Sequence, residues 1–60
     1  MLYPLTVNVL YIETDNILQM EVTGGPTYTV TMNDAAVTTH TITAAQFNDI
    51  IAMVNNASNA

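Results

Sequence analysis

The side chains of this chain that could carry acid–base or metal chemistry are a single histidine and five carboxylates. They are His40, Glu13, Asp15, Glu21, Asp34 and Asp49. His40 alone titrates near neutral pH, but a catalytic histidine needs a nucleophile or a carboxylate beside it, and the only serine, Ser58, lies in the C-terminal tail. Zinc sites draw on several histidines or cysteines, and the chain has one histidine and no cysteine. We therefore interpret His40 as a structural residue on the polar face of an edge strand.

The carboxylates suggest two further kinds of site. Paired carboxylates across a cleft could hydrolyse a glycosidic bond, but sixty residues with a thin core leave little room for a cleft. Calcium could bind at the turn formed by Glu13, Asp15 and Asn16 with help from Asp34, although the D-x-[DN]-x-[DN]-G spacing of a calcium loop is absent. The sequence predicts a protein that is not an enzyme and has no cofactor, with a calcium ion at this turn as the minor alternative.

The chain has no lysine and no arginine, and its formal net charge is −5. Affinity for nucleic acids rests largely on cations that neutralise phosphates, so we expect no binding to DNA, RNA or anionic lipid surfaces. Arginine clamps for phosphate and lysine Schiff bases are excluded for the same reason. Mimicry of DNA is disfavoured, because five acids in sixty residues are too sparse to copy a phosphate array with one charge per ~1.7 Å.

The length predicts one small domain over residues 1–60. A chain of this size buries only about 60 % of the surface that its unfolded form exposes. Small domains are usually supported by disulfides, a metal, oligomerisation or very regular packing, and disulfides are ruled out because there is no cysteine. We therefore expect an oligomer, or a protein that docks on a partner.

No targeting or membrane segment is predicted. The N-terminal stretch MLYPLTVNVLYIE has neither the basic residues nor the small-residue cleavage site of a signal peptide. The longest uninterrupted apolar run, residues 50–54, is far short of the ~20 residues that span a bilayer. We expect a soluble protein.

The hydrophobic pattern predicts strands over residues 5–13, 17–23 and 27–32, and a weak edge strand over residues 37–42. The stretches TDN, GGP and NDAA between them are rich in residues that form turns. These elements indicate an antiparallel meander of three or four strands. A polar tail is expected over residues 56–60.

A helix is predicted over residues 44–55. Thr43 and Gln46 have the spacing of a capping box, in which each side chain accepts a hydrogen bond from the backbone amide of the other residue. Ile42 and Phe47 have the spacing of the hydrophobic staple that accompanies such a box. Together with the strands, the helix predicts an α+β fold in which it packs on one face of the sheet.

The predicted core joins one stripe of this helix to one face of the second and third strands. Its members are Leu18, Met20, Val22, Tyr28, Val30, Met32, Phe47, Ile50, Ile51 and Val54. The four helix residues among them recur at i, i+3, i+4 and i+7, which is one side of a helix. We expect this layer to be a minimal core within a single chain.

The first predicted strand has apolar side chains on both faces. One face carries Leu5, Val7, Val9 and Tyr11. Leu10 and Ile12 lie on the other face, so we expect the helix to cover one face and a neighbouring chain or segment to cover the other. The candidate interface residues are Leu2, Tyr3, Leu10, Ile12 and Met53.

The segment TYTVTM alternates threonine with larger apolar residues and carries no charge or proline. Segments of this type also pair between chains, and edge strands of monomers often carry lysines that block such pairing. Since the chain has no lysine, the segment favours edges that are paired or covered in an assembly. The alternative is a self-contained sheet that uses threonine for solubility.

In general character the chain resembles small accessory virion proteins of tailed bacteriophages, such as capsid decoration or cement proteins. The resemblance lies in the β-rich stretches TYTVTM and VTTHTIT, the absence of cysteine and the low number of charges. It implies a non-enzymatic structural protein that contacts copies of itself or a larger structural protein in an assembly such as a virion. The alternative is a small soluble binding or regulatory module that docks on one host protein.

Overall fold

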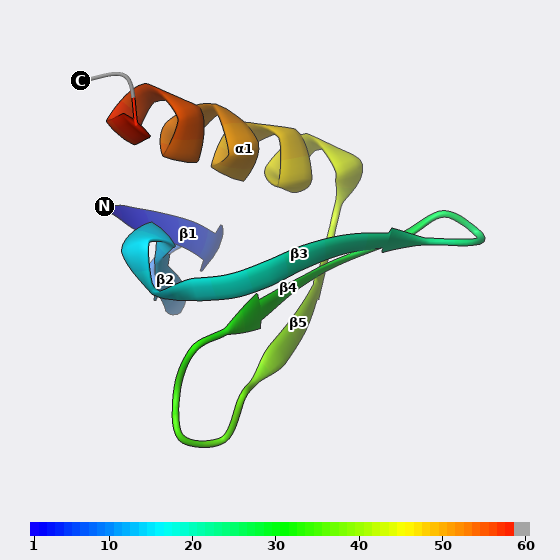
Figure 1. Cartoon of the computed structure of the whole chain (residues 1–60), viewed down its shortest axis with the longest axis horizontal. Coiled ribbons are helices and arrows are strands. Elements are labelled where there is room, and N and C mark those ends of the chain that lie inside the picture. Colours follow the sequence, from blue (N-terminus) through cyan, green and yellow to red (C-terminus); the bar gives the residue numbers. More distant parts are fainter. Residues whose placement is uncertain (59–60) are drawn as a thin grey trace.

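The computed structural model describes residues 1–58, which form five strands, a short 3-10 turn and one helix (Figure 1). In chain order these are β1 (Leu2–Thr6), β2 (Leu10–Glu13), the 3-10 turn η1 (Thr14–Asn16), β3 (Ile17–Thr23), β4 (Thr27–Met32), β5 (Thr39–Ile42) and α1 (Ala44–Ser58). β1 and β2 form one antiparallel sheet, and β3, β4 and β5 form a second. The predicted α+β class is therefore confirmed.

The prediction of a single strand over residues 5–13 is wrong, because the chain reverses direction within it. Asn8 has a φ of 64°, in the left-handed region that asparagine tolerates better than most residues. The amide of Val9 donates to the carbonyl of Thr6 at 2.9 Å and closes the turn. The apolar residues on both sides of Asn8 hide this turn, because they continue the pattern of a strand.

β4 is the central strand of the second sheet, with β3 on one side and β5 on the other. It is the TYTVTM segment, so both of its edges are paired within the chain and not with a neighbour. The hydroxyl oxygens of Thr31 and Thr39 lie 3.0 Å apart in a hydrogen bond across β4 and β5. The weak fourth strand is present as β5, at an edge of this sheet.

The core joins both sheets to the helix. Its buried apolar residues are Ile12, Val30, Met32, Ile42 and Ile50. The partly buried residues packed against them are Tyr3, Leu5, Ile17, Met20, Tyr28 and Phe47. The rings of Tyr28 and Phe47 are tilted, with centroids 5.2 Å apart, in the range of favourable aromatic pairs. Six of the ten predicted core residues therefore lie in or against this cluster.

Leu18 and Val22 were expected in the core, but both side chains are exposed. If the regular register of β3 and β4 continued, Leu18 would lie opposite Met32. A β-bulge shifts the register instead, so that Ile17 takes this position and packs against the core. The extra residue of a bulge is left unpaired. Val22 lies close to the β3–β4 turn, which extends beyond the helix in Figure 1.

The helix begins as predicted, with the capping box complete. The amide of Gln46 donates to Oγ1 of Thr43 at 3.1 Å, and the amide of Thr43 donates to Oε1 of Gln46 at 3.0 Å. Ile42 is buried and Phe47 packs against the same cluster, as a hydrophobic staple requires. The helix continues past the predicted end at residue 55 to Ser58. Of the predicted polar tail, residues 59–60 lie outside the described part of the chain.

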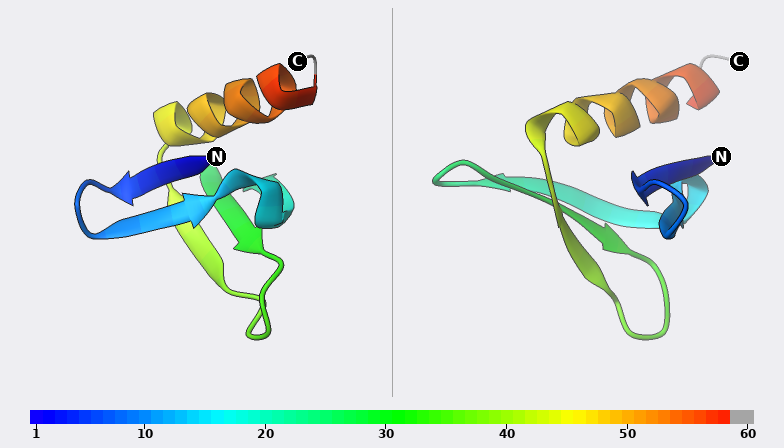
Figure 2. Two further views of the ribbon diagram at one scale, coloured as in Figure 1. Left: turned by 90° about the vertical axis from the view of Figure 1, so that its left-hand side faces the viewer. Right: turned by 180° about the vertical axis from the view of Figure 1, so that it is seen from behind.

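The buried side of the helix is turned relative to the predicted stripe. Ile50 has no exposed surface, whereas Ile51 and Val54, which were expected in the core, are exposed. Phe47 is half-buried against the core as predicted, and Gln46 and Met53 are half-buried as well. In Figures 1 and 2 the helix runs alongside β1, on one side of both sheets. Two hydrogen bonds from the helix to β1, described next, accompany this orientation.

Candidate protein interface

Two side-chain hydrogen bonds hold β1 beneath the helix. The hydroxyl of Tyr3 donates to Oδ2 of Asp49 at 3.1 Å. Nε2 of Gln46, whose Oε1 serves the capping box, donates to the carbonyl of Leu5 at 2.9 Å. Burial first, and then the hydrogen bond and the charge of Asp49, raise the pKa of Tyr3 above its ordinary value. The helix therefore sets the position of the whole β1–β2 hairpin.

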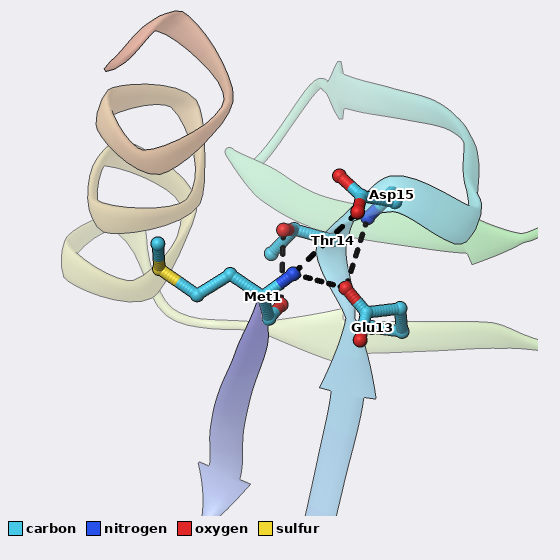
Figure 3. Close-up of polar contacts among 4 residues, drawn as sticks. All are labelled: Met1, Glu13, Thr14 and Asp15. Carbon is cyan, nitrogen blue, oxygen red and sulfur yellow. Dashed lines mark hydrogen bonds and ion pairs between the residues drawn. The ribbon is translucent and has the colours of Figure 1, made fainter. Parts of the chain in front are cut away.

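The start of β1 is held to the end of β2 and to η1 by a polar cluster (Figure 3). The α-amino group of Met1 forms an ion pair with Glu13 and lies 3.7 Å from Oδ2 of Asp15. The carbonyl of Met1 accepts two hydrogen bonds from Thr14, one from its amide and one from Oγ1, each of 2.9 Å. Thr14 is buried, so these bonds satisfy its polar atoms.

The ion pair changes the pKa of both groups. The hydrogen bond to Glu13 is the largest cause of the raised pKa of the Met1 amino group. The same bond is the largest cause of the lowered pKa of the Glu13 carboxyl group. Both groups are exposed, so the pair is screened by solvent and fixes geometry more than it adds stability.

The β1–β2 hairpin exposes apolar side chains at its turn and on both of its faces, which together we call the hairpin surface. Its residues are Leu2, Val7, Val9, Leu10 and Tyr11. Val7 and Val9, at the turn, are the most exposed of them, at 70 % and 77 %. Sequence reasoning missed both as surface residues, because it placed them on one face of a continuous strand. The asparagine between the two valines was the available signal, since asparagine favours turns.

The tip of this surface has a defined conformation. The hydroxyl of Tyr11 accepts a hydrogen bond from the amide of Asn8 at 3.1 Å and lies 3.5 Å from its Oδ1. These contacts fix the left-handed turn that carries Val7 and Val9. A surface that is ordered before it binds loses less conformational entropy on binding, which suits the tip to a role in recognition.

The structure separates the predicted interface residues. Leu2 and Leu10 are exposed on the hairpin surface. Ile12 is buried in the core, and Tyr3, which lies opposite it in β1, is half-buried against the core. The expectation that Ile12 faces a neighbouring chain is therefore wrong: its face of the hairpin packs inward, and Tyr11 faces outward. Met53 is half-buried on the helix.

His40 lies on an edge strand as expected, but not on its polar face. It is opposite the buried Val30 in β4 and is itself half-buried. Residues that are directly opposite share a face of a sheet, so His40 lies on the core side. The predicted polar face is therefore wrong, and the position supports the structural interpretation of this residue.

The residues of the possible calcium turn lie in two places. Glu13 and Asp15 adjoin the Met1 amino group. Asp34 lies in the β4–β5 turn, where its Oδ1 accepts from the amide of Thr38 at 3.0 Å. This bond is the largest cause of the lowered pKa of Asp34. No group of three or more potential ligands among His, Asp and Glu is found in the described part of the chain.

Two further observations concern the surface of residues 1–58. No pocket is found on it. Within these residues, α1 is neither long enough nor apolar enough to cross a membrane. Comparison of the chain with protein-family models, with curated proteins and with solved structures finds no match.

Proposed function

We propose that this chain is a non-enzymatic structural protein that acts by protein–protein contact in a larger assembly. The observation that carries the proposal is the balance of apolar side chains in the described residues: five are buried in the core and eleven large ones are exposed. Five of these eleven form the hairpin surface. Large exposed apolar areas on small proteins mark sites of interaction.

Two features support the hairpin surface as the contact. Its hairpin forms a sheet of only two strands, which is at best marginally stable on its own. Here the hairpin is held in place by Tyr3, Gln46 and the cluster around Met1. The contacts that hold it lie along β1 and at its start, so they leave the tip with Val7 and Val9 free to meet a partner.

Among assemblies, we propose a virion. The support for this is the β-rich, cysteine-free chain of low charge, which resembles the accessory proteins of tailed bacteriophages. Such a protein contacts a larger structural protein of the particle, copies of itself, or both. The alternative, a regulator that docks on one host protein, uses the same surface but differs in stoichiometry.

Co-sedimentation from the native source tests the proposal. An assembly protein sediments with a particle in fixed stoichiometry, whereas a regulator is recovered free or with one partner. Val9→Asp places a charge at the tip and is expected to abolish co-sedimentation while circular dichroism stays unchanged, because the partner would have to desolvate the carboxylate.

The matched control is Val37→Asp. Val37 is also an exposed valine, but it lies in the β4–β5 turn, away from the hairpin in Figure 1. This variant is expected to sediment like the parent chain. If Val9→Asp also sediments normally, the hairpin surface is not the contact. If the parent chain never sediments with a particle, the proposed assembly is wrong.

A further inference from the structure

The free edge of β3 is the longest strand edge in the described part of the chain. β3 pairs only with β4 and has seven residues, whereas β5, at the other edge of the sheet, has four. Free edges of monomeric proteins usually carry lysine, proline or other features that prevent pairing. β3 carries no lysine and no proline, and its only charge is Glu21. The bulge at Leu18 lies at one end and leaves residues 19–23 regular.

The direction of the backbone groups along this edge follows from β4. The amide of Met32 donates to the carbonyl of Thr38, on the side of β5. Backbone groups alternate in direction along a strand, so Val30 also turns its amide and carbonyl toward β5, and Thr29 and Thr31 turn theirs toward β3. Their partners in β3, Glu21 and Gln19, are thus used inside the sheet.

Met20 lies between Gln19 and Glu21, and Val22 follows Glu21. By the same alternation, Met20 and Val22 turn their amides and carbonyls to the free edge of β3. Leu18, the extra residue of the bulge, has no partner in β4. The side chains of Leu18 and Val22 are exposed as well. Unpaired backbone groups and exposed apolar side chains therefore occur together along one edge.

We propose that this edge pairs with β3 of a second copy of the chain, antiparallel and symmetric about Met20. The two three-stranded sheets then join into one sheet of six strands. The inference goes beyond the proposed function, because β3 is not part of the hairpin surface. A protein that works in an assembly through its hairpin can therefore be joined to a second copy through β3.

The register follows from the side chains that it brings together. With the two-fold axis at Met20, Met20 faces its own copy, and Val22 comes next to the bulge residue Leu18 of the second copy. Gln19 faces Glu21 of the second copy, so that an amide meets a carboxylate. Apolar residues meet apolar residues, and no carboxylate lies directly opposite another.

A register centred on Glu21 also satisfies backbone pairing but is disfavoured by charge. It would place Glu21 directly opposite Glu21 of the second copy, at the short Cα distance of a non-hydrogen-bonded pair. Like charges in this position are destabilising, and the chain has no lysine or arginine that could lie between them. The pattern of charge therefore favours the axis at Met20 over the axis at Glu21.

Single cysteines test the register, and the parent chain contributes none of its own. Gln19 and Glu21 are exposed, so Gln19→Cys and Glu21→Cys are expected to fold. In the proposed dimer these two positions form a non-hydrogen-bonded pair with Cα atoms about 4.5 Å apart, within reach of a disulfide. Under mild oxidation, a mixture of the two variants is expected to form a disulfide-linked dimer, and each variant alone is expected to form none. Cross-linking of either variant with itself, or none in the mixture, overturns the register.

A charge at the edge tests the pairing itself. Val22→Lys and the control Val37→Lys replace valines that are equally exposed, at 51 % and 50 %. Analytical ultracentrifugation of the purified chain is expected to show a dimer whose Kd rises about tenfold or more in Val22→Lys and is unchanged in Val37→Lys. Because both copies are acidic, added salt is expected to strengthen the dimer.

The result is separable from the test of the hairpin surface. The ultracentrifuge experiment uses the purified chain alone, whereas co-sedimentation needs the native particle. A chain that remains monomeric up to millimolar concentration overturns the β3 dimer and leaves the proposed assembly standing. A dimer that Val22→Lys does not weaken places the contact between copies elsewhere and also overturns the inference.

Discussion

Tyr3 and Asp49, 46 residues apart in the sequence, are joined by a hydrogen bond of 3.1 Å from the phenol hydroxyl to the carboxylate. This contact links β1, at the start of the chain, to the helix α1 near its end. Together with the bond from Gln46 to the carbonyl of Leu5 and the burial of Ile50, it holds one side of the helix against the rest of the protein.

Asp49→Asn is expected to lower the pKa of Tyr3 toward its ordinary value of about 10, because the carboxylate is one cause of the upward shift. Burial is the larger cause, so part of the shift remains. Because the pKa of Tyr3 is raised in the folded state, it stabilises the fold at pH values below the ordinary pKa of tyrosine. This contribution is lost as the pH rises through the pKa of Tyr3 in the folded chain. Ultraviolet titration of tyrosine checks the prediction, and an unchanged titration curve would show that the contact is absent in solution.

Gln46→Glu and Gln46→Ala are expected to separate two roles of one side chain. Glutamate keeps the acceptor of the capping box but cannot donate to the carbonyl of Leu5, so it should cost about 1 kcal/mol of unfolding free energy. Alanine loses both contacts and should cost about 2 kcal/mol. Urea denaturation measures the difference. No loss of unfolding free energy in Gln46→Glu would mean that the bond to Leu5 contributes nothing, and equal losses in the two variants would mean that the capping-box acceptor contributes nothing.

Glu13→Gln is expected to make the melting temperature less dependent on pH, both in the acid range and in the alkaline range. The lowered pKa of Glu13 stabilises the fold above its ordinary value of about 4.3, and this is lost as pH falls through the folded value. The raised pKa of the Met1 amino group stabilises the fold below about 8, and this is lost as pH rises through the folded value.

Asp34 supplies the control for that measurement. Its pKa is also lowered, through a contact with Thr38 that does not involve the Met1 amino group. Asp34→Asn should therefore flatten only the acid side. An unaltered alkaline side in Glu13→Gln would contradict the ion pair at Met1.

Ile12→Asp and Leu10→Asp are expected to differ sharply. Ile12 is buried, and an unpaired charge in the core costs several kcal/mol, comparable to the ~5 kcal/mol that a domain of this size holds. Circular dichroism should show that Ile12→Asp is unfolded. Leu10 is partly exposed near the tip of the hairpin, so Leu10→Asp should stay folded. A folded Ile12→Asp would contradict the position of β2.

Val37→Asn is expected to stabilise the chain by about 1 kcal/mol. Val37 has a φ of 51° in the β4–β5 turn, a conformation that is strained for a β-branched residue and better tolerated by asparagine. The midpoint of urea denaturation should therefore rise. Val9→Asn, at an exposed valine without positive φ, should produce no such gain.

The features predicted correctly from the sequence are those set by neighbouring residues. The start of α1 follows from Thr43 and Gln46, which bond to each other within a single turn. The bounds of β3 and β4 match the prediction residue for residue, because turn-forming residues flank them. Gly25, in the turn between them, has the positive φ that glycine allows.

Most of the features predicted wrongly depend on contacts between distant residues. The β-bulge in β3 places Ile17, and not Leu18, opposite Met32 in β4, and it is therefore defined by pairing with a distant residue. The rotation that exposes Ile51 and Val54 accompanies the bonds from the helix to β1. The assignment of Ile12 to an interface failed for a local reason, because the turn at Asn8 was missed and with it the hairpin whose Ile12 face packs inward. Interface roles for Leu2 and Leu10 stay predictions.

The long sequence separation of the contacts between β1 and α1 also orders the events of folding. Neighbouring strands of β3, β4 and β5 are joined by short turns, so this sheet can form while the chain ends are still apart. The bonds from Tyr3 to Asp49 and from Gln46 to Leu5 span 46 and 41 residues, and closing such loops costs more entropy. We expect the hairpin to dock last and to detach first, so that amide protection in hydrogen exchange is lower in β1 and β2 than in β4.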